Sequence, residues 1–279
     1  MTQGSLIAGA DCSGLRCNIS PQLHSALSQP IPAATSQSTG NAPSRAVVAL
    51  CTFNEAENVE AVVAGLRRSL PTVDVIVVDD NSPDGTAQLV RQMAQADQAI
   101  QVLVRENERG LGSAIRHAMQ YAVDHAYDYF LNLDGDLSHD PQQMTLLFER
   151  AMQDPEVAVV IGSRYVPGGE IIGWPWRRQI MSRMVNRFAN LCLRLPVRDC
   201  SGSMRCYRVD ALTKLGLKQL RVNGYAVLEE VLLRLHQQDA PIVEVPITFT
   251  ERQYGESKLT MAEAVRSMVQ IISLAFRRA

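Results

Sequence analysis

The chain has 279 residues, of which 46% are hydrophobic, and its formal net charge at pH 7 is -2. This length and apolar content allow one large domain or two small ones with a substantial buried core. The near balance of positive and negative residues excludes bulk electrostatic attraction to nucleic acid, so we expect no nucleic-acid partner.

The first 44 residues differ in composition from the rest of the chain. They are rich in Ser, Gln, Ala, Pro and Thr and show little apolar periodicity. Such a segment buries too little apolar surface to offset the entropy lost on ordering. We therefore expect residues 1–44 to form a disordered, low-complexity tail.

From Arg45 onward, short β-branched runs alternate with helical patterns. We expect strands at residues 46–53, 73–80, 101–106, 127–134 and 157–165. Helices are expected between and after them, at residues 56–70, 86–96, 113–126 and 141–153. This alternation is typical of βαβ units and predicts an α/β fold with a mostly parallel sheet covered by helices on both faces.

The second half of the chain has a different pattern. It predicts a strongly basic helix at residues 177–195, one more strand at residues 240–252 and a final helix at residues 260–276. Pro246 indicates an edge position or a break in that strand, because proline cannot donate to the hydrogen-bond ladder.

The basic helix has one apolar face. Apolar residues recur on it at helical spacing, and arginines supply charge: Ile180, Met184, Phe188, Leu191 and Leu195, with Arg177, Arg178, Arg183, Arg187 and Arg194. This pattern suits a helix that lies at an anionic headgroup interface. It suits equally a helix that packs its apolar face on the core and keeps its arginines in water. The final helix, followed by Arg277 and Arg278, is similar.

Cysteine spacing and hydropathy bear on the compartment. The six cysteines show no paired metal-ligand spacing, so we expect reduced thiols. No run approaches the roughly 18 to 20 consecutive apolar residues that span a bilayer, and the first residues lack the basic-then-apolar order of a signal peptide. We expect a cytoplasmic protein with neither a signal peptide nor a transmembrane helix.

Two acidic residues, Asp134 and Asp136, follow an apolar run in "NLDGDLSHDP". Side chains alternate along an extended backbone, so these carboxylates lie on the same side and repel each other. A divalent cation such as Mg2+ or Mn2+ removes that repulsion, because it binds one or two carboxylates and fills its other positions with water and phosphates. We predict a metal site here, with a solvated strand-to-helix turn as the alternative.

A second acidic motif, "VVDDNSPDGT", ends the second expected strand. Its turn-forming residues predict a turn and a helix start, which leaves Asp79 and Asp80 unexplained. A carboxylate at a strand end can accept hydrogen bonds from ribose hydroxyls or a base N–H, and Asp80 is our candidate. The later "GLGSA" lacks the third glycine of a dinucleotide-binding loop and indicates a helix entry or a close backbone approach.

Basic residues follow several of the same strands. They are Arg164 in "GSRY", Arg177 and Arg178 after "GWPW", and Arg252 and Lys258 in "ERQYGESKL". Each one alone is most often a surface cation. Together with a metal they could clamp a diphosphate leaving group.

In this order and spacing, the motifs resemble family 2 glycosyltransferases, and specifically dolichol-phosphate or polyprenol-phosphate mannosyltransferases. The matching segments are "TFNEAENV", "VVDDNSPDGTA", "RGLGSA", "LDGDLSHDP", "GSRYVPGG", "GWPWRRQIMSR", "DCSGSMRCY", "GYAVLEE" and "RQYGESKL". The resemblance implies a GT-A type, Rossmann-like catalytic domain at residues 45–259. Residues 260–279 would then form a C-terminal amphipathic helix at a membrane interface.

The resemblance also implies roles for individual residues. The donor nucleotide would be met by Cys51, Phe53, Glu55, Val78 and Asp80, and the metal with the diphosphate by Asp134, Gly135, Asp136 and Ser138. Phosphate or acceptor contacts would come from Arg164, Arg178, Arg252 and Lys258, with Asp136, Arg164 and Arg252 at the reacting centre. Two residues depart from the family pattern: Cys51 replaces the usual proline, and Phe53 replaces a tyrosine, which keeps stacking but loses a hydroxyl.

The implied reaction transfers mannose from GDP-mannose to a polyprenyl or dolichyl phosphate with inversion and releases GDP. No general base is assigned, because a phosphate acceptor is already anionic, its second pKa being about 6. Glu230 in "GYAVLEE" stands where the family has an acid, but a buried acid paired with an arginine such as Arg205 explains it as well.

The same motifs leave several alternative functions to consider. The same transfer with UDP-glucose or another nucleotide sugar is the nearest alternative, because no residue specifies guanine or mannose. A phosphoacceptor receiver domain does not explain the second acidic pair and the basic second half, and a silent nucleotide-sugar binder does not explain the complete set of acids and cations. A processive polysaccharide synthase would need a Q-x-x-R-W segment and membrane spans. We expect peripheral association with the cytoplasmic face of a membrane, with a membrane-protein partner as an open possibility.

Overall fold

The protein structure is a computed structural model that describes residues 44–222, 224, 226–252 and 261–276. The tail expected at residues 1–44, apart from its last residue, lies outside the described residues, and so do Lys258, Arg277 and Arg278. Cys51, Cys192, Cys200 and Cys206 are free thiols, as expected.

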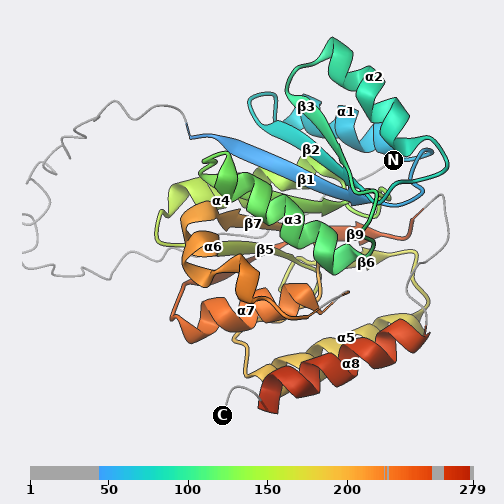
Figure 1. Cartoon of the computed structure of the whole chain (residues 1–279). Coiled ribbons are helices and arrows are strands. Elements are labelled where there is room, and N and C mark those ends of the chain that lie inside the picture. Colours follow the sequence, from blue (N-terminus) through green and yellow to red (C-terminus); the bar gives the residue numbers. More distant parts are fainter. Residues whose placement is uncertain (1–43, 223, 225, 253–260, 277–279) are drawn as a thin grey trace, which may run out of the picture. The chain divides into compact units, whose positions relative to one another are not determined.

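A seven-stranded sheet, in the order β3-β2-β1-β4-β7-β5-β8, forms the centre of the described part (Figure 1). Its strands are β1 Ala46–Thr52, β2 Asp74–Asp79, β3 Ile100–Val104, β4 Tyr129–Asp134, β5 Val159–Ser163, β7 Arg205–Arg208 and β8 Ile242–Pro246. β7 runs antiparallel to β4 and β5, and the other neighbouring pairs are parallel. The predicted mostly parallel sheet is confirmed.

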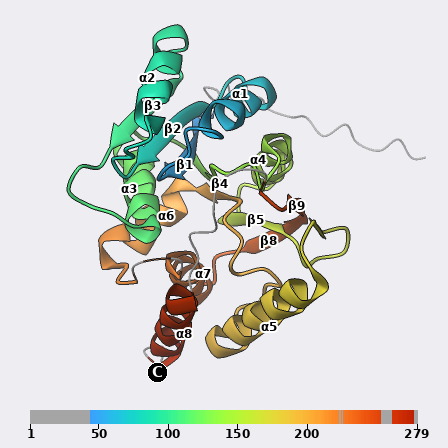
Figure 2. The same cartoon turned by 90° about the vertical axis from the view of Figure 1, so that its right-hand side faces the viewer.

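The central strands are apolar on both faces because helices cover both. Along β1, Val47 and Ala49 pack into one core cluster while Val48 and Leu50 pack into the other. The first cluster also takes residues from α3 Leu111–Asp124, α6 Val209–Leu215 and α7 Val227–Gln237. The second takes residues from α1 Val59–Ser69, α2 Thr86–Ala96 and α4 Met144–Gln153. Figure 2 shows α3 and α6 on one side of the sheet and α1 and α4 on the other.

The strand expected at residues 240–252 is two strands. β8 ends at Pro246, and β9 Thr248–Thr250 leaves the large sheet to pair with β6 Glu170–Ile172. The break expected at Pro246 is therefore confirmed, whereas a single strand is wrong. β6, β7, α6, α7 and the short 3-10 turn η3 Leu217–Gln219 have no counterpart in the sequence prediction. The helix expected at residues 141–153 is the 3-10 turn η2 Pro141–Gln143 followed directly by α4.

The basic helix is α5 Trp176–Leu193, and the final helix is α8 Met261–Phe276; they lie side by side (Figure 1). Ile180, Met184 and Leu191 are exposed, whereas Ala189, Leu193 and Leu195 pack into the first core cluster. The alternative of an apolar face packed on the core therefore holds for the C-terminal end of this helix and not for its first turns. Of the helices in the described ranges, none combines the length and the apolar character needed to cross a membrane.

Candidate active site

The carboxyl ends of β1, β2 and β4 lie next to one another. In the strand register, Cys51 pairs with Val78 on one side and with Asp134 on the other. Three of the predicted nucleotide and metal contacts therefore stand in one row across the sheet edge where ligands bind in parallel α/β folds.

Asp79 at the end of β2 has a local structural role. Its carboxylate accepts hydrogen bonds from the Thr52 hydroxyl at 2.9 Å and from the Ser82 backbone N–H at 2.8 Å. Asp84 similarly accepts from the Ala56 N–H and from Thr86 at the start of α2. These contacts confirm that "NSPDGT" is a turn and helix start.

Asp80, the expected ribose or base contact, already has protein donors on both carboxylate oxygens. Arg105 Nε donates to Oδ1 at 2.7 Å, a second guanidinium nitrogen contacts the same oxygen, and the Gly110 N–H donates to Oδ2 at 2.7 Å. The buried Asp80–Arg105 pair thus fastens the loop before α3 to the end of β2. A nucleotide would have to share these oxygens.

The aromatic position Phe53 is half-buried beside a cation. The Arg109 guanidinium carbon lies 5.1 Å from the centre of the Phe53 ring, within cation–π range. Glu55 is buried and accepts a hydrogen bond from Asn58 at 2.9 Å. Sequence reasoning missed Arg105 and Arg109; their only signal was their position in the loop that follows a strand.

Asp136, the second carboxylate predicted to bind a metal, is buried and held from two sides. Ser138 donates to its Oδ1 through both the backbone N–H, at 3.0 Å, and the hydroxyl, and Arg252 Nη2 lies 3.0 Å from its Oδ2. Ser138 therefore fixes the Asp136 carboxylate through hydrogen bonds from its backbone N–H and its hydroxyl. Gly135 between the two acids lies so close to β1 that a Cβ would stand 3.2 Å from the Thr52 methyl group.

Asp134, the first carboxylate predicted to bind a metal, is half-buried beside the buried imidazole of His139. Burial raises the pKa of Asp134, and the Asp136 carboxylate adds to that increase while His139 opposes it. Burial also lowers the pKa of His139, against the attraction of Asp134. His139 Nδ1 lies 3.9 Å from Asp134 Oδ2. This histidine was not singled out in the sequence, where its only signal is its place in the acidic motif.

Arg164 is buried in an ion pair, although the sequence suggested a phosphate contact. Its backbone N–H, Nε and Nη2 all donate to Asp199, the side-chain distances being 2.7 and 2.8 Å. Burial alone would raise the pKa of Asp199, but the Arg164 guanidinium holds it below its ordinary range. Bidentate pairing of this kind fixes the orientation of a guanidinium.

Arg178 and Arg252 are linked through Glu251, the residue that follows β9. Arg178 Nη1 pairs with Glu251 at 2.7 Å and stacks 4.0 Å from the centre of the Trp174 ring, while the next residue, Arg252, contacts Asp136. The first turn of α5 is thereby connected to the metal carboxylates. Lys258, the fourth expected cation, lies outside the described residues.

Glu230 is a buried acid paired with an arginine, as the structural alternative expected, but its partner is Arg234 and not Arg205. The buried Glu230 carboxylate accepts from the N–H groups of Arg221 and Val222 and pairs with Arg234 at 2.9 Å. Arg205 instead donates to backbone carbonyls and to the Tyr207 hydroxyl. Glu230 is a structural acid that joins α7 to the segment before it.

The neighbouring Glu229 provides a pH-dependent prediction. Burial raises its pKa from 4.5 to about 7, and its Oε2 has no hydrogen-bond partner within the described ranges. The unfolded chain loses this proton above pH 4.5 and the folded chain only near pH 7, so folding stability falls between these values and stays lower above them. At pH 8, Glu229→Gln should therefore raise the free energy of unfolding by up to roughly 3 kcal/mol, with little change at pH 4.

Urea denaturation of wild type and variant at both pH values measures this difference. Glu230→Gln is the matched control, because it removes an acid with three donors and should lower stability at pH 8. An equal effect of Glu229→Gln at pH 4 and pH 8 would contradict the prediction.

The donor set at Asp134 and Asp136 fits a divalent cation. No group of three or more His, Cys, Asp and Glu side chains able to hold a metal occurs among the residues that the structure describes. Two carboxylates at a strand end, with cationic side chains close by, are what Mg2+ uses when water and substrate phosphates complete its shell. The unpartnered His139 nitrogens beside Asp134 add a polar group that a ligand could engage.

Residues 47–216 match the sequence profile described as glycosyl transferase family 2. The chain belongs to this family. The "Polyprenol monophosphomannose synthase" of Mycolicibacterium smegmatis is 33% identical over 254 residues, covering 88% of this chain and 95% of the relative. The "Undecaprenyl-phosphate mannosyltransferase" of Micrococcus luteus is 36% identical over 216 residues, covering 77% and 88%.

Solved structures of glycosyltransferases with the GT-A fold are similar to this chain. Glucosyl-3-phosphoglycerate synthase from Mycobacterium tuberculosis, in complex with Mn2+, UDP-glucose and phosphoglyceric acid, aligns with a TM-score of 0.62 at 19% identity, over 85% of this chain and 80% of that one. A mannosyltransferase from Pyrobaculum calidifontis, in complex with GDP-mannose and Mn2+, aligns with a TM-score of 0.56 at 18% identity, over 85% and 67%. The GT-A type fold implied by the sequence motifs is confirmed.

Proposed function

We propose that this glycosyltransferase transfers mannose from GDP-mannose to a polyprenyl phosphate, with inversion at the anomeric carbon and release of GDP. The observation that carries the proposal is the similarity, along nearly their whole length, to two relatives named for mannosyl transfer to polyprenol or undecaprenyl phosphate. The GDP-mannose complex of a structural neighbour supports the choice of nucleotide.

In the proposed reaction, a phosphate oxygen of the acceptor attacks the anomeric carbon while the bond to the diphosphate breaks on the opposite face. The bonding electrons leave with GDP, so negative charge grows on the diphosphate. A divalent cation held by Asp134 and Asp136 would neutralise part of that charge. Arg252 adds positive charge beside Asp136, and the anionic acceptor needs no general base.

The predicted site residues would contact the metal and diphosphate, the nucleotide, or the acceptor phosphate. Asp134, Asp136 and Arg252 meet in space and would contact metal or diphosphate, with Gly135 and Ser138 shaping the loop. Cys51, Phe53, Glu55, Val78 and Asp80 would contact the nucleotide, a role that the register of Cys51 beside Val78 at the sheet edge supports. Arg164 would act by orienting this region through Asp199, while Arg178 would meet the acceptor phosphate from α5.

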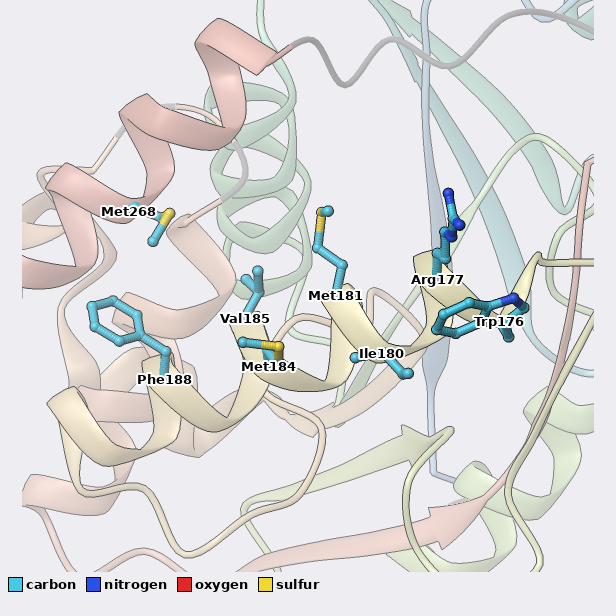
Figure 3. A pocket seen from close by; sticks show the side chains of 8 residues that line it. All are labelled: Trp176, Arg177, Ile180, Met181, Met184, Val185, Phe188 and Met268. Atoms are coloured by element: carbon cyan, nitrogen blue, oxygen red, sulfur yellow. The ribbon is translucent and has the colours of Figure 1, made fainter.

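The acceptor is a lipid, and we propose that α5 and α8 bring the protein to the surface of a membrane, on its cytoplasmic face. A groove of about 550 Å³ lies between the two helices, with eight lining residues: Trp176, Arg177, Ile180, Met181, Met184, Val185, Phe188 and Met268. Figure 3 shows the α5 side chains in a row, with Met268 of α8 beside Phe188. Exposed arginines on α5 complement anionic headgroups.

A substitution in this groove should weaken membrane binding. Met184 is 66% exposed, and Met184→Glu removes apolar contact with the lipid and adds a repelled charge. Because burying one such side chain is worth about 1.5–3 kcal/mol, partition onto vesicles of phosphatidylcholine and phosphatidylglycerol should fall about tenfold or more in a sedimentation assay. Leu146→Glu on α4 is the control, since Leu146 is exposed away from the groove. Equal partition of Met184→Glu and wild type would contradict this orientation.

The substrate assignment is tested with purified protein, detergent-dispersed undecaprenyl phosphate, Mn2+ or Mg2+, and a panel of labelled nucleotide sugars. Label in the lipid phase from GDP-mannose is the expected result. Label from UDP-glucose instead would establish the alternative donor. Folded protein that transfers label from no donor would overturn the proposed activity.

A further inference from the structure

His139 is a buried polar side chain without hydrogen-bond partners. Its exposed fraction is 2%, and neither ring nitrogen has a partner in the described part of the chain. A neutral imidazole carries one donor and one acceptor, and a buried polar group left unsatisfied costs about 1–3 kcal/mol. Such a group needs an explanation beyond packing, since an apolar side chain would avoid this cost.

The ring of His139 packs against aromatic side chains on one side. Phe249 packs edge-on against it, with ring centres 5.0 Å apart and planes at 87°, and Trp174 packs on Phe249 in the same way at 5.2 Å. The backbone is tied as well, because the Thr250 N–H donates to the Ser138 carbonyl at 2.9 Å. The imidazole orientation is therefore fixed by β9.

On its other side, the imidazole approaches Asp134. The 3.9 Å between Nδ1 and Asp134 Oδ2 is too long for a hydrogen bond. A small rotation of the half-buried Asp134 side chain, or one bridging water, would close it. Asp136 has its supports in Ser138 and Arg252, while the Ser203 side chain approaches Asp134.

We propose that His139 is a positioning residue for Asp134: its Nδ1–H donates to the carboxylate when that carboxylate takes its place at the divalent cation. This inference rests on the metal dependence in the proposed function. Groups that hydrogen-bond a metal-ligating carboxylate fix which oxygen faces the ion, and removing them costs 10- to 100-fold in metal affinity or activity. The carboxylate thereby satisfies one imidazole nitrogen.

The test compares His139→Asn, His139→Gln and His139→Phe. An asparagine amide nitrogen reaches about where Nδ1 lies, a glutamine amide nitrogen reaches instead toward Nε2, and phenylalanine keeps the aromatic volume without nitrogen. We measure Mn2+ binding in the presence of GDP by electron paramagnetic resonance. The Mn2+ dissociation constant should rise at least about tenfold in the Gln and Phe variants and should stay near the wild-type value in the Asn variant.

Thermal unfolding, together with turnover measured at increasing Mn2+ concentrations, shows whether His139 orients Asp134 or only fills space in the core. The Phe variant should unfold at no lower temperature than wild type, and its turnover should recover at high Mn2+ concentration. Unchanged Mn2+ affinity in a folded Gln or Phe variant would overturn the inference. If the Phe variant does not fold, the Mn2+ affinities of the Asn and Gln variants still test the inference, because both side chains are polar amides and differ in where the amide nitrogen lies. Wild-type protein that binds no Mn2+ with GDP would refute the proposed metal dependence, which is a separate outcome.

Discussion

Asp136→Asn should lower turnover about 100- to 1,000-fold, the range seen when one group that stabilises developing charge is removed. The substitution removes a negative charge from the expected metal site and keeps the shape of the side chain. An amide oxygen can still accept from the Ser138 N–H, and the Arg252 side chain is 27% exposed and can be hydrated. The fold should therefore survive while the affinity for the cation falls.

Turnover is measured as label transferred to lipid across a range of Mn2+ concentrations, with circular dichroism to confirm folding. Asp140→Asn is the matched control, because Asp140 is exposed in the same loop and only caps η2 through the Gln142 N–H at 2.9 Å. Asparagine is an equally good helix cap. Near-normal turnover of Asp136→Asn would show that the acidic pair is only a turn.

The parallel half of the fold was predictable because its signals are local. Each strand from β1 to β4 is a short, mostly apolar run followed by a helical pattern, and a strand buried on both faces has to be apolar at successive positions. The candidate metal carboxylates, Asp134 and Asp136, could also be found from a local signal. Two acids directly after an apolar run repel each other, and either a bound cation or a solvated turn explains why they are there.

The antiparallel strand β7 was missed because its sequence does not look like a buried strand. It reads "RCYR", and its first arginine has no exposed surface. That arginine, Arg205, is satisfied by carbonyl groups from residues 200, 202 and 228, which no local pattern reveals. The partner of Glu230 was also assigned wrongly, because Arg205 was named and the structure pairs Glu230 with Arg234. The spacing of four residues between Glu230 and Arg234 on one helix face was a local signal for this pair.

The two arginines of the candidate site show the same limit. Sequence position placed Arg164 and Arg252 together as phosphate contacts after strand ends. In the structure, Arg252 lies against Asp136, whereas Arg164 is paired with Asp199, a carboxylate 35 residues further on. Residue type and position could not distinguish a cation that faces a ligand from one that neutralises a buried acid, because the acid comes from a distant segment.

Asp199→Ala should destabilise the protein by about 3–5 kcal/mol, because it leaves the buried Arg164 guanidinium without its carboxylate. Both side chains are almost inaccessible to water, with exposed fractions of 8% for Arg164 and 0% for Asp199. The Gly202 N–H also loses its acceptor. Urea denaturation at pH 7 measures the loss. The control is Asp210→Ala, which breaks the partly exposed Arg208–Asp210 pair and should cost less than about 1 kcal/mol.

The double variant Arg164→Met/Asp199→Leu then separates structure from catalysis. It removes both buried charges, so it should recover most of the stability that Asp199→Ala loses. If Arg164 acts only by holding this part of the site together, the double variant should also keep turnover within about tenfold of wild type. A stable double variant without turnover would show instead that the Arg164 guanidinium contacts the substrate, as its place after β5 first suggested. A loss of under about 1 kcal/mol in Asp199→Ala would contradict the buried ion pair itself.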